Sequence, residues 1–236
     1  MIPHKYFPYY NQTVGACKKC DPAGFVQKGG LYTPCTCYQE YIKLKKLHDS
    51  GLPKSYWNKS LQDFNGDKKA LEIVKDYINN LPSNLVKGIG LYLYGTPGIG
   101  KTLLSSYIVR AAIKQNVNAK FYYFTDILNT FTESWHDNDA RDEVESNIIN
   151  SDLLICDDLG REFKSNKKLH EAVLDSVIRS RASQLRPIIL TSNFDILDVK
   201  ETYGAGIVDL FKESLVVVQV KGDSYRKTEM EGKQND

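Results

Sequence analysis

The fold of this chain is decided by one stretch, Leu91-Tyr92-Leu93-Tyr94-Gly95-Thr96-Pro97-Gly98-Ile99-Gly100-Lys101-Thr102. An apolar, aromatic run typical of a buried strand leads into a glycine-rich turn, and helical spacing follows. The pattern G-x-x-x-x-G-K-[ST] between a strand and a helix is the phosphate-binding loop. Its glycines let backbone N–H groups turn inward around an anion, and the next helix adds its N-terminal dipole. We therefore predict a nucleoside triphosphate site.

Two side chains of this loop have distinct expected roles. Lys101 is expected to reach the β- and γ-phosphates, and the Thr102 hydroxyl to ligate Mg²⁺. An accidental glycine-rich turn is the alternative, which the strand before it and the helix after it disfavour. The residues expected to contact the nucleotide, ATP or ADP, are Gly95, Thr96, Pro97, Gly98, Ile99, Gly100, Lys101, Thr102 and Leu103.

A second apolar run, residues 153–156, ends in the acids Asp157 and Asp158. Four apolar residues fit a buried parallel strand, and α/β sheets bind ligands at the carboxyl ends of strands. We expect Asp157 to hold Mg²⁺ with Thr102, and Asp158 to polarise the attacking water. Asn193 ends a third apolar run and becomes a phosphate or water sensor if its strand lies between the other two. The alternative in each case is an ordinary polar residue at a strand end.

Four of the five cysteines lie within the first 37 residues, as Cys17-x-x-Cys20 and Cys35-x-Cys37. In a reducing compartment such clustering indicates a metal rather than disulfides. Four thiolates leave no position for water, so we predict a structural Zn²⁺ site that stabilises a segment too small to fold on apolar burial alone. Reduced thiols without metal, or a redox pair, are the alternatives, and His4 or His48 could replace one ligand.

Length and composition limit the classes of protein. The chain has 236 residues, 42% of them hydrophobic, and a net charge of +2, which gives no global basic field. No apolar run approaches the ~18 residues that span a bilayer, so we expect a cytoplasmic protein without membrane contact.

We predict an α/β fold with two parts. Residues 1–57 form a zinc-binding N-terminal region with a linker helix. Residues 58–236 form a P-loop ATPase domain around a parallel sheet flanked by helices.

The order of these motifs resembles one family over nearly the whole chain. The segments that carry the resemblance are 88–102, Leu154-Ile155-Cys156-Asp157-Asp158-Leu159-Gly160, Leu190-Thr191-Ser192-Asn193, the cysteine pairs followed by a basic helix, and the ending Lys221-Gly222-Asp223-Ser224-Tyr225-Arg226. They are similar to AAA+ replicative-helicase loaders of the DnaC/DnaI type, and to the related IstB-type ATPases of transposition.

The resemblance implies roles for the residues and for the protein. Residues 95–102 correspond to Walker A, Asp157 and Asp158 to Walker B, and Asn193 to sensor 1. Loaders of this family bind a hexameric DnaB-type helicase and, gated by ATP, place it on single-stranded DNA during replication initiation. The N-terminal zinc region would bind the helicase, and the ATPase part, as a homo-oligomer on helicase or DNA, would contact the DNA.

Two departures from the family pattern bear on catalysis. Walker B ends Asp-Asp where AAA+ proteins commonly have Asp-Glu, which predicts a weak, Mg²⁺-dependent ATPase. Residues 206–212 contain no arginine where loaders often present an arginine finger, which leaves Arg179 and Arg181 as candidates, or as ordinary helix-end cations. The alternatives to a loader are an IstB-type ATPase assisting DNA transposition and an ATP-binding adaptor without productive hydrolysis.

Overall fold

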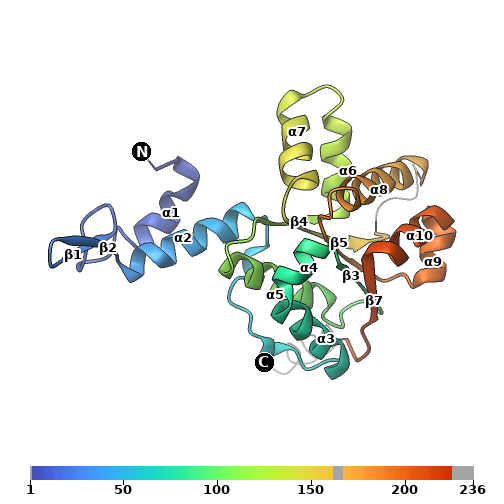
Figure 1. Ribbon diagram of the computed structural model, residues 1–236, viewed down its shortest axis with the longest axis horizontal. Coiled ribbons are helices and arrows are strands. Elements are labelled where there is room, and N and C mark those ends of the chain that lie inside the picture. The colour runs from blue at the N-terminus through green and yellow to red at the C-terminus, as the bar shows by residue number, and fades with distance from the viewer. Residues whose placement is uncertain (1, 162–166, 225–236) are drawn as a thin grey trace, which may run out of the picture. The chain divides into compact units, whose positions relative to one another are not determined.

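The computed structural model describes residues 2–161 and 167–224. The chain divides into two compact units, Met1–Gly51 and Leu52–Asp236 (Figure 1). The sequence suggested a boundary after residue 57 instead. Leu52 and Trp57 are buried, and the Trp57 carbonyl accepts a hydrogen bond from Arg110 of the second unit. The segment after Gly51 therefore packs with the second unit.

The first unit is a β-hairpin between two helices. Its elements are α1 (Phe7–Gln12), β1 (Phe25–Lys28), β2 (Leu31–Pro34) and α2 (Thr36–Asp49). The strands are antiparallel, and the two-residue turn Gly29-Gly30 has positive φ at both positions, as tight hairpin turns require. Tyr6, Tyr41 and Leu47 are buried in this unit, and the Tyr6 hydroxyl donates to Asp49.

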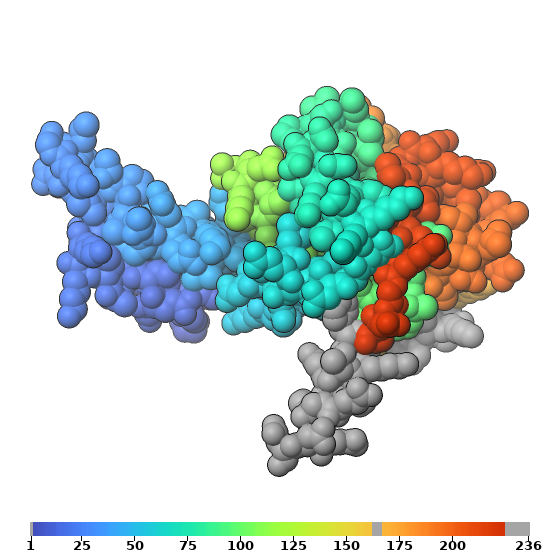
Figure 2. Space-filling view, turned by 90° about the horizontal axis from the view of Figure 1, so that it is seen from below, coloured from blue at the N-terminus to red at the C-terminus, as the bar shows by residue number. Residues whose placement is uncertain are grey.

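The second unit contains a five-stranded parallel sheet, which confirms the predicted fold class. Its strands are β3 (Gly90–Tyr94), β4 (Ala119–Tyr123), β5 (Leu153–Leu159), β6 (Ile188–Ser192) and β7 (Leu215–Gln219), in the order β4-β5-β6-β3-β7. β7 was not predicted from the sequence; it lies at the edge of the sheet and at the molecular surface (red in Figure 2). Since β6 lies between β3 and β5, the three predicted motif-bearing strands are neighbours.

Helices cover both faces of this sheet. The helices are α3 (Lys68–Asn79), α4 (Leu81–Lys87), α5 (Lys101–Lys114), α6 (Phe124–Glu133), α7 (Asn138–Glu143), α8 (Lys167–Ala182), α9 (Ile196–Tyr203) and α10 (Ala205–Ser214), with a π-helix at Val144–Ile149. α5 packs on β4, β5 and β6 and against α3. The other face packs with α6, α8, α9 and α10 around one apolar core. Both faces of the sheet are buried at β3, β5 and β6, which explains why these strands read as continuous apolar runs.

Two single residues shape helix starts in the second unit. Pro82 lies in the first turn of α4, where proline is tolerated. Asp137 accepts from the N–H groups of Asp139 and Ala140 and caps α7. Among the described residues, no helix combines the length and apolar content that crossing a bilayer requires.

Candidate functional site

The glycine-rich loop connects the end of β3 to the start of α5. Gly98 and Gly100 have φ values of 83° and 94°, in the left-handed region that favours glycine. A Cβ atom at Gly95 would overlap the carbonyl oxygen of Val220, so this position also excludes a side chain. The N-terminus of the 14-residue helix α5 begins at Lys101, directly after the loop. The loop therefore has the backbone shape and helix dipole of an anion site.

Lys101 and Asn193 come together although 92 residues separate them in sequence. The Lys101 amine donates to the Asn193 side-chain oxygen at 2.8 Å and to the carbonyls of Gly95 and Thr96 at 2.7 and 2.9 Å. The amine is anchored among oxygen acceptors at the mouth of the loop, and the Lys101 residue is only 8% exposed. Asn193 follows β6, the strand between β3 and β5, as the sequence analysis required of a sensor residue.

Asp157 is 1% exposed, and both of its carboxylate oxygens are hydrogen-bonded. The Thr102 hydroxyl donates to Oδ2 at 2.9 Å, and the Thr191 hydroxyl donates to Oδ1 at 2.6 Å. Burial raises the pKa of Asp157 to about 6, against the two hydroxyl donors that lower it, so the carboxylate is ionised at neutral pH. Buried charges are normally paired or coordinate metals. A carboxylate beside a hydroxyl is a donor set that fits Mg²⁺.

Asp158 lies beside Asp157 in an irregular part of β5. Its φ is +63°, unusual for a residue other than glycine. Its N–H donates to the Thr191 hydroxyl oxygen at 3.0 Å, and its carboxylate forms an ion pair with Arg161 at 2.8 Å. Thr191 and Arg161 were not predicted as site residues. The polar run Thr191-Ser192-Asn193 at a strand end was the available signal for the first, and nothing in the sequence singles out the second.

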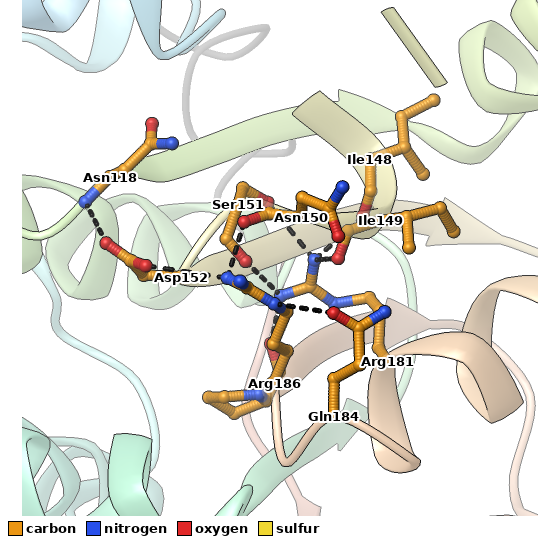
Figure 3. Close-up of polar contacts among 10 residues, drawn as sticks. Asn118, Ile148, Ile149, Asn150, Ser151, Asp152, Arg181, Gln184 and Arg186 are labelled. Atoms are coloured by element: carbon orange, nitrogen blue, oxygen red, sulfur yellow. Dashed lines mark hydrogen bonds and ion pairs between the residues drawn. The ribbon is translucent and has the colours of Figure 1, made fainter. Parts of the chain in front are cut away.

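The structure contradicts one of the two arginine-finger candidates. Arg181 is fully buried, so its guanidinium is not available to contact another subunit. It donates to the carbonyls of Ile148, Ile149, Ser151 and Pro187 and to the Ser151 hydroxyl (Figure 3). Burial lowers its pKa to about 9, so it stays charged at neutral pH. Arg179 is exposed and forms an ion pair with Asp175 on its own helix.

The four N-terminal cysteines converge in the first unit. Their sulfur atoms all lie within 4.8 Å of one another, with Cys17–Cys35 at 4.0 Å and Cys20–Cys37 at 3.4 Å. Tetrahedral Zn²⁺ with bonds of about 2.3 Å places sulfurs roughly 3.8 Å apart, so the cluster fits this ion. His48 instead hydrogen-bonds Tyr9 through Nδ1, and the His4 ring packs on Phe7. The fifth cysteine, Cys156, is buried in the sheet core.

Lys221 lies beside the start of α3 in the second unit. The Lys221 N–H donates to the carboxylate of Asp67, the residue that caps α3. Tyr225 and Arg226, which complete the ending quoted for the family resemblance, lie outside the described residues.

Comparison with known proteins confirms the resemblance. Residues 76–232 match the family described as IstB-like ATP binding protein. The replicative helicase loader DnaI of Bacillus subtilis is 26% identical over 117 residues, which cover 50% of this chain but only 37% of that loader. A crystal structure of the DnaC helicase loader superposes with a TM-score of 0.63 at 23% identity, covering 72% of this chain and 100% of that one. The replication initiator DnaA bound to AMPPCP and single-stranded DNA superposes with a TM-score of 0.60 at 22% identity, covering 73% of this chain and 51% of that one.

Proposed function

The chain belongs to the family of IstB-like ATP-binding proteins, and we propose that it is an ATP-dependent loader of a replicative helicase. It would bind a DnaB-type hexamer and deliver it to single-stranded DNA during replication initiation. The similarity to the loader DnaI supports this reading. The main structural support for the proposal comes from two hydrogen bonds, Lys101–Asn193 and Thr102–Asp157. They connect residues at the ends of three neighbouring strands.

The proposed roles of the site residues follow from these contacts. Lys101 neutralises phosphate charge at the mouth of the loop, and Thr102 with Asp157 holds the cation. Asp158 orients water, and Asn193 senses the phosphate end through its contact with Lys101. When bound, ATP with Mg²⁺ supplies the energy of phosphate release. We expect weak turnover, because the shorter Asp158 side chain replaces the more common glutamate.

The first unit is the proposed helicase-binding part. It is a separate compact unit, and its cysteine cluster fits a structural Zn²⁺. The proposed partners of the whole assembly are the helicase, single-stranded DNA and further copies of this chain.

Co-purification with the replicative helicase of the source cell or its host tests the loader proposal. The unmodified protein should retain the helicase, whereas the Cys20→Ser, Cys37→Ser double variant should lose it because its zinc site is broken. Lys101→Ala is the matched control, since it changes only the second unit and should keep the helicase. Absence of helicase binding to the unmodified protein at micromolar concentration would contradict the loader function.

A second candidate, an IstB-type ATPase that assists transposition, is favoured by the family match itself. Such a protein would bind duplex DNA in an ATP-dependent manner without the helicase. Gel-shift titration with duplex and single-stranded DNA distinguishes the two, since a loader should prefer single strands in the presence of helicase. An adaptor without hydrolysis would release no phosphate above the Lys101→Ala background in a phosphate-release assay.

A further inference from the structure

We propose that Thr191 is a positioning residue that sets the arrangement of the two neighbouring acids, Asp157 and Asp158. The inference rests on the proposed function, because those acids matter only if the site binds magnesium and nucleotide. Thr191 lies in β6, is 1% exposed, and is not part of the phosphate loop. It would act through the acids rather than by touching the nucleotide.

A bulge between β5 and β6 makes this arrangement. In the parallel pairing, Cys156 lies opposite Leu190 and Leu159 lies opposite Ser192. Two residues of β5 therefore face one residue of β6: Asp157 and Asp158 share Thr191. Bulges of this kind occur beside active sites, where they redirect side chains.

The hydroxyl of Thr191 uses both of its hydrogen-bonding abilities at this bulge. It donates its proton to Asp157 Oδ1 at 2.6 Å and accepts the N–H of Asp158 at 3.0 Å. With Thr102 on Oδ2, the first bond fixes the Asp157 carboxylate from both sides. The second holds the backbone of Asp158 in its left-handed conformation, which costs a non-glycine residue free energy. One oxygen atom thus fixes the orientation of one acid and the backbone of the other.

The adjacent Ser192 shows what an ordinary structural hydroxyl does in the same strand. Its hydroxyl donates to the Leu159 carbonyl at 2.7 Å and accepts the Phe194 N–H at 3.0 Å. The first of these bonds also joins β6 to β5, and neither bond contacts Asp157 or Asp158. Ser192 is therefore a matched control of equal burial on the neighbouring position.

Fluorescent mant-ADP titration of the full chain, with and without Mg²⁺, tests the inference. Thr191→Val keeps the volume and shape of the side chain but removes the hydroxyl. We expect the Mg²⁺-dependent gain in mant-ADP affinity to fall by roughly 10- to 100-fold, the usual effect of losing a partner of a metal ligand. Binding without Mg²⁺ should change little, and Thr191→Ser should restore most of the gain.

Thermal unfolding and the Ser192→Ala control separate positioning from general stability. Ser192→Ala should lower the melting temperature yet keep the Mg²⁺-dependent gain. The inference is overturned if Thr191→Val keeps the gain, or if Ser192→Ala loses as much of it as Thr191→Val. If the affinity of the unmodified protein for mant-ADP does not depend on Mg²⁺, the proposed magnesium site is contradicted. The inference about Thr191 is then contradicted as well.

Discussion

The buried carboxylate of Asp157 lowers the stability of the folded chain. Its carboxylate is almost completely buried, and burial raises its pKa from 3.8 to about 6. One unit of pKa corresponds to about 1.4 kcal/mol. The ionised form therefore destabilises the native chain by up to roughly 3 kcal/mol at neutral pH. A neutral residue of the same shape should remove this cost.

We predict that Asp157→Asn raises the melting temperature by several degrees at pH 7.5 in the presence of EDTA. The gain should shrink as the pH falls from about 6 toward 4. In that window the native carboxyl binds a proton that the unfolded chain does not, so the unmodified protein becomes relatively more stable. Differential scanning calorimetry at pH 7.5 and 5 measures both effects. Asp209→Asn, on an exposed ion pair, is the control and should change little.

An Asp157→Asn variant that is less stable at both pH values would contradict this explanation of the pKa. It would mean that the Thr102 and Thr191 donors, rather than burial, dominate the energy of the carboxylate.

The identities of the site residues were predictable from the sequence wherever a motif or a strand end indicates them. Lys101, Thr102, Asp157 and Asn193 follow recognisable strand ends, and the structure brings them into one hydrogen-bonded network. Their roles in nucleotide chemistry stay predictions. The part played by Thr191 was not predictable, because it depends on a bulge, and bulges leave no reliable trace in one sequence.

At the scale of elements, Arg181 joins three parts of the second unit. It lies at the end of α8, and it bonds the last carbonyls of the π-helix Val144–Ile149 and the Pro187 carbonyl before β6 (Figure 3). In the sequence it looks like any cation in the last turn of a helix. Only the path of the chain from the π-helix into β5 shows that carbonyls surround it.

We predict that Arg181→Met lowers the free energy of unfolding by about 3 kcal/mol, because several buried carbonyl oxygens lose their donors. Urea denaturation followed by circular dichroism measures this change. Arg179→Ala, on the same helix, removes only an exposed ion pair and should cost about 0.5 kcal/mol or less. Equal unfolding midpoints for the two variants would contradict the structural role of Arg181.

Strands with long apolar runs were easy to predict from the sequence, whereas two other elements were missed. The apolar runs of β3, β5 and β6 have the length and composition of buried strands, and each forms one. β7 was missed although Val216 to Val218 are β-branched and residues 215–218 are all apolar, because no motif drew attention to this run. α7 was missed because a run of polar residues hides the cap that Asp137 supplies.

At the scale of the whole molecule, two compact units have different sources of stability. The second has a large apolar core around its sheet. The first has a short hairpin and a few buried aromatic residues, and its cysteine cluster is suited to a structural ion.

We predict about one zinc ion per chain by atomic emission spectroscopy. A strong zinc chelator should unfold residues 2–51, seen as fast amide hydrogen exchange there, and should leave exchange in the sheet of the second unit unchanged. Cys156→Ser is a control that should keep the zinc. Metal-free protein that protects the amides of the first unit normally would end the zinc proposal.

We propose that neighbouring strand ends close one magnesium–triphosphate site, with Lys101 and Thr102 following one strand and Asp157 on another. Isothermal titration calorimetry with ATP and Mg²⁺ tests it most directly. We expect one ATP site per chain, with affinity about 10- to 100-fold weaker in Lys101→Ala, since a charge-assisted contact is lost. Absence of binding heat from the unmodified protein, or equal affinity in Lys101→Ala, would contradict it.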